Sequence, residues 1–596
     1  MPALLAALLI ALGLMAASPA ARAGGERVLR YALPVAETGF DPAQISDLYS
    51  ATLVAHLFDS PLQYDFLARP ARLRPGSAAA MPEVSADGRR IRVRIRPGIL
   101  FADDPAFKGT PRELVAADYV YSIKRHFDPR WRSSSLGTFE EYLAGLPALR
   151  AQALKTGRFD YDTEVEGVRV IDRYSFELNL VKPSFVMVYA LADCRATCAL
   201  AREVVEAQGD RIMEHPVGTG PFRLTSWKRS SRMVFERNPA YREEHYDAQP
   251  AAGDAEGQAI AQRLRGRRLP MLDRVEIDVV EEAQPRWLAF LNGQHDLIEM
   301  VPNEFAPIAF PGNRLAAYLE RRGVRMDRYL RPDIRYTFFN WTDPVVGGGQ
   351  PAQVALRRAI SLGYNSHDDL RILRRDQGIP AHGLAPPGTA GYDPDLRTDM
   401  NAYSPARARA LLDLHGYLDR DGDGYRERPD GQPLTLEFAT GNDQSAKQVN
   451  ELWKRGMDAI GIRLRFKRAK WPEQLKAARA GKLQMWAVGG TAGAPDADGT
   501  LASLYGPNTG RANLSRFDLP EYNRLYEQST RLPDSPERNA LIREMTRLVL
   551  AYQPWKVHVH SISTDLSHDR VIGWKAHPVM RRRWDHIDVN PQPAGG

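Results

Sequence analysis

The sequence predicts a mixed α/β protein with more than one domain, and three observations carry that prediction. Short runs of alternating apolar and polar residues, typical of strands, are interspersed with segments whose apolar residues recur at helical spacing. The composition is that of a globular protein, with 43% hydrophobic and 26% charged residues. At 596 residues the chain is longer than one hydrophobic core usually serves, so at least two domains are expected.

The predicted elements follow one another along the first half of the chain. Residues 89–95 alternate strictly between apolar and basic residues, which predicts a half-buried strand. Residues 114–127 carry apolar side chains at helical spacing. Residues 170–180 predict a pair of strands, and a Gly-rich turn at 216–221 leads into a further strand at 222–227.

The charge balance argues against nucleic acid as a partner. The chain has 80 Lys and Arg against 73 Asp and Glu, a net charge of +7 that is small for this length. Its basic clusters at 263–268 and 581–583 are short and lack the interleaved aromatic residues on which bases stack.

The first 23 residues have the features of a signal peptide. An apolar run at 3–17 is too short to span a bilayer and ends at Ala21-Arg22-Ala23, a typical cleavage pattern, although no Lys or Arg precedes the run. Gly24 follows instead of Cys, so no lipid anchor is expected. The alternative is a buried N-terminal helix. The pattern favours an exported, soluble mature protein.

Export changes the interpretation of the two cysteines. Cys194 and Cys198 are four residues apart, a spacing that one helical turn brings within disulfide reach. No further Cys or His lies beside them to complete a zinc site. We expect a local disulfide, with a redox-active pair as the alternative.

Ordered motifs along most of the chain resemble those of one family, the family 5 periplasmic solute-binding proteins of ABC transporters, which bind oligopeptides and dipeptides. The resemblance extends from Tyr31 to Trp555 and rests on the order and spacing of six segments: residues 84–101, 116–125, 217–222, 238–241, 356–361 and 403–412.

This resemblance implies a two-lobed α/β clamshell of type II, in the large class with an extra subdomain in the first lobe. The expected organisation is a signal peptide at 1–23, lobe I at 24–305 and lobe II at 306–554, with a return to lobe I at 555–596. The extra subdomain is expected at about 61–215, and the two crossings between lobes near 302–317 and 551–560. Residues 247–268 are interpreted as a solvated insertion loop, or alternatively as a basic contact surface for the permease.

The resemblance also implies the function. The protein would be a monomer in the periplasm that captures a peptide-like solute between its lobes and delivers it to an ABC permease, without enzymatic activity or a cofactor. The same fold also carries metal chelates, haem, opines and sugars, which stay open as alternatives. An exported hydrolase is the rival class, but the sequence contains no G-x-S-x-G or H-E-x-x-H motif.

One position departs from the family pattern. In the peptide binders an Asp of the second lobe receives the α-ammonium group of the peptide, and Gly493 stands at that position here. Either Asp496 or Asp498 takes over this role, or the ligand has no free amine there. The alternative for both carboxylates is a cap on the following helix.

The remaining candidate ligand contacts also come from the resemblance. Trp486 either walls the pocket or fills the core, and Arg511 has a guanidinium suited to a carboxylate. The other candidates lie in the first loop, after a strand near 336–339, and in the loop after Tyr505: Glu37, Thr38, Asn340, Trp341 and Asn513.

An Asp-rich turn has the first half of a calcium-loop pattern. Asp419, Asp421 and Asp423 occupy positions 1, 3 and 5, and Gly424 occupies position 6. Position 12 is Asp430 where a bidentate Glu is expected, and a strand pattern follows instead of a helix. We favour a structural turn, with a bound structural calcium as the alternative.

Overall fold

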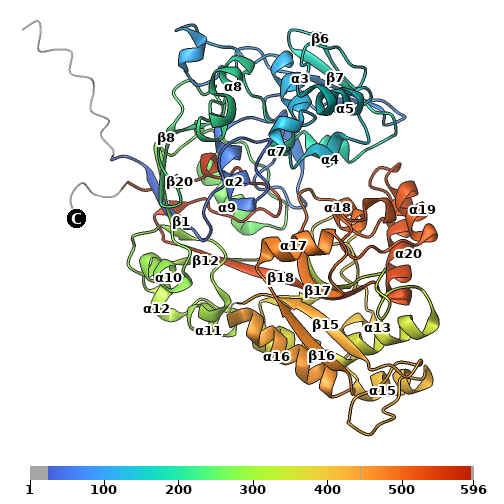
Figure 1. Ribbon diagram of the computed structural model, residues 1–596. Helices are drawn as coiled ribbons and strands as arrows, with labels where there is room; N and C mark the ends of the chain where they lie inside the picture. The colour runs from blue at the N-terminus through green and yellow to red at the C-terminus, as the bar shows by residue number, and fades with distance from the viewer. Residues whose placement is uncertain (1–24, 443, 592–596) are drawn as a thin grey trace, which may run out of the picture.

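A computed structural model describes residues 25–442 and 444–591 of the chain. The predicted signal peptide at 1–23 lies outside the described residues. Figure 1 shows the α/β architecture, in which one large sheet extends through two lobes and a separate subdomain lies above it.

The large sheet has 12 strands, and the long strand β18 (Trp555–Ser567) belongs to both of its halves. The first part of β18 pairs with β13 and β14, and its last part pairs with β12 and β11. One half contains β8 (Phe222–Lys228), β9 (Arg232–Arg237), β10 (Arg274–Val279), β1 (Val28–Leu33), β11 (Leu297–Ile298) and β12 (Arg325–Leu330). The other contains β13 (Asp333–Phe339), β14 (Gly378–Pro380), β15 (Thr435–Thr440), β16 (Arg463–Arg468) and β17 (Met485–Thr491).

Buried apolar side chains form separate clusters on the two halves. The largest cluster contains residues from 29–297 and 571–589, whereas two others lie within 334–557. We therefore assign residues 25–330 and 568–591 to lobe I and residues 333–554 to lobe II, with β18 between them.

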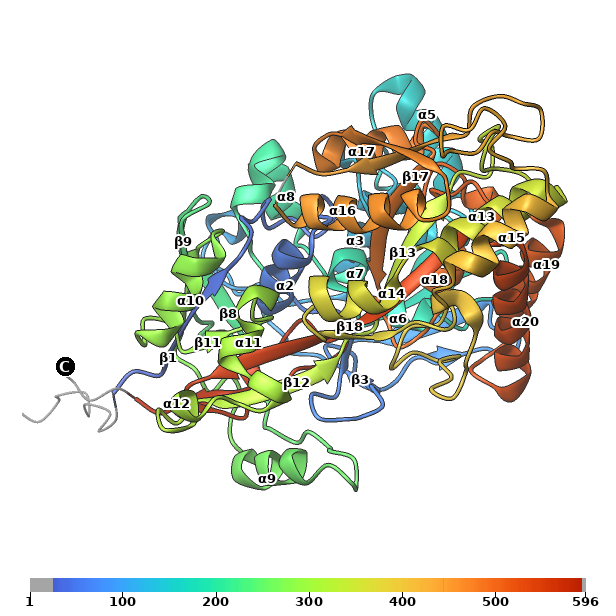
Figure 2. The same ribbon diagram turned by 90° about the horizontal axis from the view of Figure 1, so that it is seen from below.

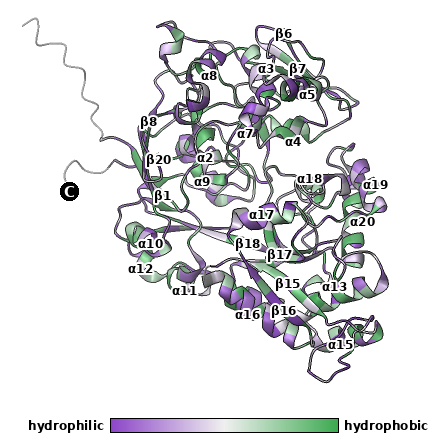
Figure 3. Ribbon diagram, in the orientation of Figure 1, coloured by the Kyte–Doolittle hydropathy of each residue, from purple (hydrophilic) through white to green (hydrophobic). Residues whose placement is uncertain are grey.

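Helices cover the sheet in both lobes. Those of lobe I outside the subdomain are α2 (Leu48–Leu57), α9 (Ala255–Leu264), α10 (Ala283–Leu291), α11 (Ala306–Ala309) and α12 (Ala317–Glu320). Those of lobe II are α13 (Pro351–Gly363), α14 (Ser366–Asp368), α15 (Pro405–Leu414), α16 (Gln444–Asp458), α17 (Trp471–Arg479), α18 (Asp498–Ala502), α19 (Pro520–Ser529) and α20 (Pro536–Tyr552). In Figure 3 α16 is mostly hydrophilic while the neighbouring β15 is mostly hydrophobic, as expected for a helix with one face in solvent.

The subdomain of lobe I is built on a sheet of four strands. Its strands, in spatial order, are β4 (Glu83–Val84), β5 (Arg90–Arg94), β7 (Ser175–Asn179) and β6 (Val168–Asp172). The predicted alternation is confirmed in β5, where Ile91 and Val93 are fully buried and the arginines between them are exposed. The helices are α3 (Ala116–Arg125), α4 (Leu136–Phe139), α5 (Leu146–Thr156), α6 (Met187–Ala190), α7 (Cys194–Thr197) and α8 (Arg202–Gln208).

The first crossing between lobes lies later than expected. The chain leaves β12 and enters β13 at residues 331–332, not at 302–317. Residues 303–320 instead form short helices, because Phe310 and Leu319 are buried in a cluster with Trp287 and Leu566. The second crossing is in β18, where the pairing partner changes from β14 to β12 between residues 561 and 562.

The segment 247–268 is not a solvated loop. It contains α9, which begins after Asp254, whose carboxylate caps the helix by accepting a hydrogen bond from Gly257 N. Ala261 and Leu264 are buried, because this face of α9 packs into the core of lobe I. Figure 2 shows α9 at the edge of the molecule.

The predicted disulfide between Cys194 and Cys198 is present and closes the single turn of α7. Among the described helices, none combines the length and apolar character that a membrane span requires.

Candidate ligand-binding cleft between the lobes

A cavity of about 850 Å³ lies between the subdomain of lobe I and lobe II. This volume is within the range of roughly 300–1,000 Å³ typical of small-molecule sites. In Figure 1, α18 of lobe II faces α4 of the subdomain across this region. The lining comes mainly from four segments of loops and helix ends, at 137–142, 182–193, 490–508 and 526–531, and from the sheet.

Aromatic side chains supply much of the apolar lining. Tyr336 of β13 stacks on Trp555 of β18, with 3.7 Å between the ring centroids. On another wall, the ring centroids of Tyr505 and Tyr526 lie 4.6 Å apart, and the subdomain contributes Tyr142 to the lining. Such rings offer broad contact area to the side chains or rings of a ligand.

Asp496 and Asp498 both line the cavity, but their carboxylates have different partners. Asp496 is buried and accepts two hydrogen bonds from the guanidinium of Arg538, at 2.5 and 2.8 Å. Asp496 also accepts from the backbone N–H of Asp498, which closes the turn into α18. The charge of Asp496 is therefore already balanced within lobe II.

Asp498 is half-buried and accepts a hydrogen bond of 3.1 Å from the Tyr526 hydroxyl. No Lys or Arg of the described chain forms an ion pair with it. Burial, with the nearby negative charge of Asp496 as a second cause, raises the pKa of Asp498 to about 6. A ligand cation at this carboxylate would offset the free-energy cost of ionising it, because a buried charge is costly unless it is paired.

Lobe I contributes a charged pair at the opposite wall. Lys182 forms an ion pair of 2.7 Å with Glu141 and lies 4.8 Å from the centre of the Tyr142 ring. All three line the cavity. The pair is neutral overall. Among the described carboxylates of the lining, Asp498 and the exposed Glu527 form no ion pair, and Asp498 is the half-buried one of the two.

The predicted contacts of the first loop lie away from this lining. Glu37 is buried and accepts hydrogen bonds from Trp227 Nε1 at 2.7 Å and from the backbone of Ser230 at 2.9 Å. The Thr38 hydroxyl donates to Asp47 at the start of α2. Both side chains fasten the loop to lobe I.

The predicted contacts near 340 have structural partners in lobe II. Asn340 is buried and donates to the carbonyls of Gly481 and Leu483, both at 3.0 Å. Trp341 packs edge-to-face on Phe517 and lies under the guanidinium of Arg357. Neither side chain lines the cavity.

Trp486 is 3% exposed and packs on Trp471, so it fills the core and does not wall the cleft. Asn513 is completely buried and donates to the carbonyls of Tyr505 and Phe517. The amide of Asn513 is therefore hydrogen-bonded to the backbone and not available to a ligand.

Arg511 has a role that no local pattern indicates. It is exposed and forms an ion pair of 3.2 Å with Glu140 of the subdomain, so the pair joins the two lobes. An exposed pair of this kind contributes roughly 0–1 kcal/mol, so it is at most a weak contact between the lobes.

The Asp-rich turn has the geometry of a hydrogen-bonded turn. Oxygens of Asp419, Asp421 and Asp423 lie within 4.8 Å of one another and are exposed, but Asp430 is not among them. Asp423 forms an ion pair of 2.5 Å with Arg463. Asp430, at the twelfth position of the calcium-loop pattern, thus does not join the other three carboxylates, and we do not assign a calcium site to this turn.

Several residues at the cleft were missed from the sequence. They come from the subdomain and from α19 and its following turn, where no motif distinguishes them from ordinary surface residues. The one signal was the Pro183-Ser184 turn at the end of a predicted strand, which places that loop at a sheet edge. The missed residues are Tyr142, Lys182, Tyr189, Tyr526 and Arg531.

Comparison with known proteins gives a consistent result. The family model for bacterial extracellular solute-binding proteins, family 5, matches residues 72–511. The chain is 27% identical over 589 residues to Di/tripeptide-binding protein 2 of Pseudomonas aeruginosa, covering 96% of this chain and 97% of that protein. It is 22% identical over 572 residues to Heme-binding protein A of Haemophilus influenzae, covering 94% of this chain and 91% of that protein.

The fold is also that of a solved structure. The ABC transporter-associated periplasmic binding protein DppA from Helicobacter pylori, in complex with peptide STSA, superposes with a TM-score of 0.73 at 18% identity, covering 95% of this chain and 99% of that one. The predicted two-lobed binding-protein fold is thereby confirmed. The family consists of binding proteins without enzymatic activity, and this chain is a member of the family 5 bacterial extracellular solute-binding proteins.

Proposed function

We propose that this protein is the binding component of an ABC importer and that its ligand is a short peptide with a free amino terminus. After export to the periplasm it captures the peptide in the cleft, closes its two lobes around it and delivers it to the membrane permease. Closure is favoured because a bound ligand contacts both lobes and so shifts the equilibrium toward the closed arrangement.

The observation that supports this proposal is the state of Asp498. A half-buried carboxylate at the wall of a cleft, with no ion pair to the described chain, matches the ammonium group of a peptide. The aromatic walls suit side chains of varied size, as a peptide carrier requires.

Isothermal titration calorimetry with trialanine and N-acetyl-trialanine tests the proposal. Wild-type protein should bind trialanine and bind the acetylated form at least tenfold more weakly, since a charged hydrogen bond contributes roughly 1.5–3 kcal/mol. The variant Asp498→Asn should lose the preference for the free amine.

Asp395→Asn is the matched control, because Asp395 is exposed in lobe II and does not line the cavity. Equal affinity of wild type for both peptides would contradict the role of Asp498. Native mass spectrometry of protein expressed in the periplasm would identify a co-purifying ligand, and haem or a metal chelate in place of a peptide would contradict the peptide assignment.

A further inference from the structure

A second, smaller cavity of about 50 Å³ continues from the cleft into lobe I. It shares Asp193 and Gly493 with the large cavity. Its remaining lining includes Tyr64, Cys194 and Arg581. We call these five residues the inner recess.

Arg581 differs from the two arginines that follow it. Arg582 pairs with Asp59 at 2.6 Å, and Arg583 pairs with Glu299 at 2.6 Å. For Arg581 the described residues provide no hydrogen bond and no carboxylate within ion-pair distance. It is half-buried and lines the recess.

The other charges around Arg581 leave it uncompensated. Asp193 accepts two hydrogen bonds from Arg195, at 3.1 and 2.6 Å, so these two charges cancel. Burial, followed by the positive charge of Arg195, lowers the pKa of Arg581 to about 10, and the guanidinium is protonated at neutral pH. A half-buried cation without a partner is unfavourable unless an anion meets it.

Tyr64 provides a second unused polar group in the recess. Its side chain is buried, and its hydroxyl has no hydrogen-bond partner among the described residues. Nearly all buried polar atoms in folded proteins have a partner, so an unpaired hydroxyl beside an unpaired guanidinium marks a place for a ligand atom.

Gly493 adds no side chain to the opening of the recess, where the charge of Asp193 is already paired with Arg195. A Cβ atom at this position would lie 3.9 Å from a guanidinium nitrogen of Arg195. A carboxylate built on that atom would add a negative charge at the entrance and compete with an incoming anion. Glycine leaves the entrance open and the local charge positive.

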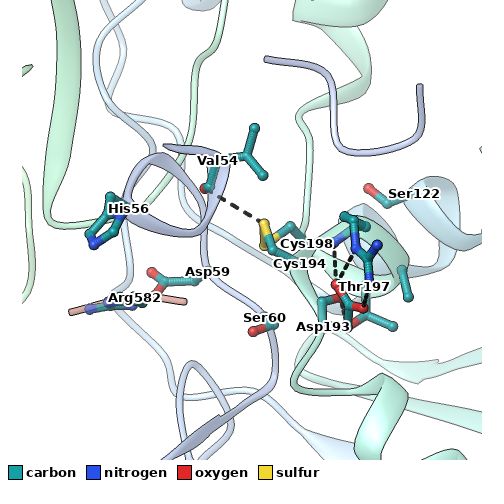
Figure 4. The surroundings of a disulfide bond; sticks show 12 residues. Val54, His56, Asp59, Ser60, Ser122, Asp193, Cys194, Thr197, Cys198 and Arg582 are labelled. Atoms are coloured by element: carbon teal, nitrogen blue, oxygen red, sulfur yellow. Dashed lines mark hydrogen bonds and ion pairs between the residues drawn. A yellow bond between two sulfur atoms is a disulfide. The ribbon is translucent and has the colours of Figure 1, made fainter. Parts of the chain in front are cut away.

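The disulfide fixes the wall of the recess. Figure 4 shows Asp193 directly before the turn that Cys194 and Cys198 close. Asp193 caps this turn through the backbone N–H of Arg195. The disulfide therefore restricts the position of the neutral Asp193–Arg195 pair near Arg581.

We infer that the inner recess binds a carboxylate of the ligand through the guanidinium of Arg581, with the Tyr64 hydroxyl as a second donor. A cavity of this size has room for roughly three to five water-sized positions, which is enough for a carboxylate. Arginine presents a planar fork of N–H groups that matches the two oxygens. The inference deepens the proposed function and rests on it: the ligand carries its ammonium at Asp498 and a carboxylate in the recess.

Calorimetry on the mature chain with three probes tests the inference. Trialanine has a terminal carboxylate, trialanine amide has none, and Ala-Glu-Ala amide has a carboxylate only on its side chain. Arg581→Gln should weaken binding of trialanine ten- to hundredfold and leave trialanine amide unchanged. If the side-chain carboxylate occupies the recess, Ala-Glu-Ala amide responds to the substitution in place of trialanine.

Three further variants separate binding from folding. Arg581→Lys keeps the charge and should retain more affinity than Arg581→Gln. Tyr64→Phe removes only the hydroxyl and should weaken the carboxylate probes severalfold. Arg211→Gln is the control, because Arg211 is exposed and lines neither cavity, and it should bind every probe as wild type does.

The inference is overturned if Arg581→Gln and Tyr64→Phe bind every probe as tightly as wild type. Failure of the proposed function has a different signature, namely that no peptide binds at all. In that case N-acetyl-alanine and its amide serve as probes: tighter binding of the acid that is lost in Arg581→Gln supports the recess, and no difference between acid and amide overturns it.

Discussion

Arg538 and Asp496 form a buried two-point ion pair between α20 and the loop before α18. The guanidinium also donates to the carbonyl of Ser529 at the end of α19. One arginine thus ties three elements of lobe II together. Asp498, two residues further on, forms no ion pair within the described residues and accepts a hydrogen bond from Tyr526. The Arg538–Asp496 pair has a structural role at the wall of a binding cleft.

Replacing Asp496 should damage stability more than binding. Asp496→Asn leaves the buried guanidinium of Arg538 without its charge partner, which costs about 3–5 kcal/mol in comparable buried pairs. Urea unfolding measures the change. The exposed Asp395→Asn variant is the control, and a loss below about 1 kcal/mol in Asp496→Asn would show that the pair is not structural.

Binding should depend on pH through Asp498. Its pKa is about 6 in the unliganded protein, and only the ionised carboxylate attracts an ammonium group. Affinity for trialanine should therefore fall about tenfold between pH 7.5 and pH 5, since one pH unit below the pKa leaves about a tenth of the group ionised. Calorimetry at several pH values measures this. The same profile in Asp498→Asn would assign the pH dependence to another group.

The unliganded protein should become more stable when Asp498 is neutralised. The folded pKa is raised from 3.8 to about 6, so the folded state holds more protons than the unfolded state between these values. The contribution of this group to stability therefore declines as pH rises through that window. At pH 8 the variant Asp498→Asn should unfold at a higher temperature than wild type, because it removes the charge that burial disfavours. A lower melting temperature at pH 8 would contradict the expectation.

Glu37 should behave as a structural residue. Glu37→Gln weakens the acceptor for Trp227 Nε1 and Ser230 N in a buried site, which should cost about 1–3 kcal/mol of stability. Affinity for any ligand of the cleft should stay within twofold of wild type, because Glu37 does not line the cavity. Thermal melting measures the stability and calorimetry on the same preparation measures the affinity. A loss of affinity without a loss of stability would indicate that Glu37 contacts the ligand.

Removal of the disulfide should have a limited effect on stability. Cys194 and Cys198 are separated by only four positions, so the bond closes a short loop and restricts the unfolded chain little. Chain-entropy reasoning for such a loop gives roughly 2 kcal/mol. The double variant Cys194→Ser/Cys198→Ser, compared with wild type by urea unfolding, measures it. A loss above about 5 kcal/mol would mean that the bond supports more than its own turn.

Much of the fold could be predicted from local sequence patterns. The alternation in residues 89–95 predicted β5. The start of α15 is likewise local, since Pro405 is its first residue and the Ser404 hydroxyl accepts from Arg407 N. Such signals depend on neighbours within a few residues, and local sequence retains them. Local patterns do not indicate α9 in the segment 247–268, because this helix is stabilised by burial against distant parts of lobe I and not by a strong pattern of its own.

The candidate site could be predicted only in part. The loop with Gly493, Asp496 and Asp498 was found, because the motif order located it. The contacts expected from Asn340 and Trp486 were not at the cleft, since the side chains of both are buried within lobe II. The position of a residue next to a motif does not indicate whether its side chain faces the cleft or makes its contacts inside the lobe.

The sequence by itself determined the family, the α/β character, the disulfide and the absence of a carboxylate at Gly493. Only the tertiary structure decided which of the two aspartates forms an ion pair within the described residues, because Asp496 is neutralised by Arg538, 42 residues away along the chain. It also decided that Arg581 and Tyr64 line the same recess, where the described part of the chain gives the Arg581 guanidinium no ion-pair partner. The physical reason is the same in both cases: the charge state and availability of a side chain depend on partners from distant segments, which folding brings together and local sequence does not encode.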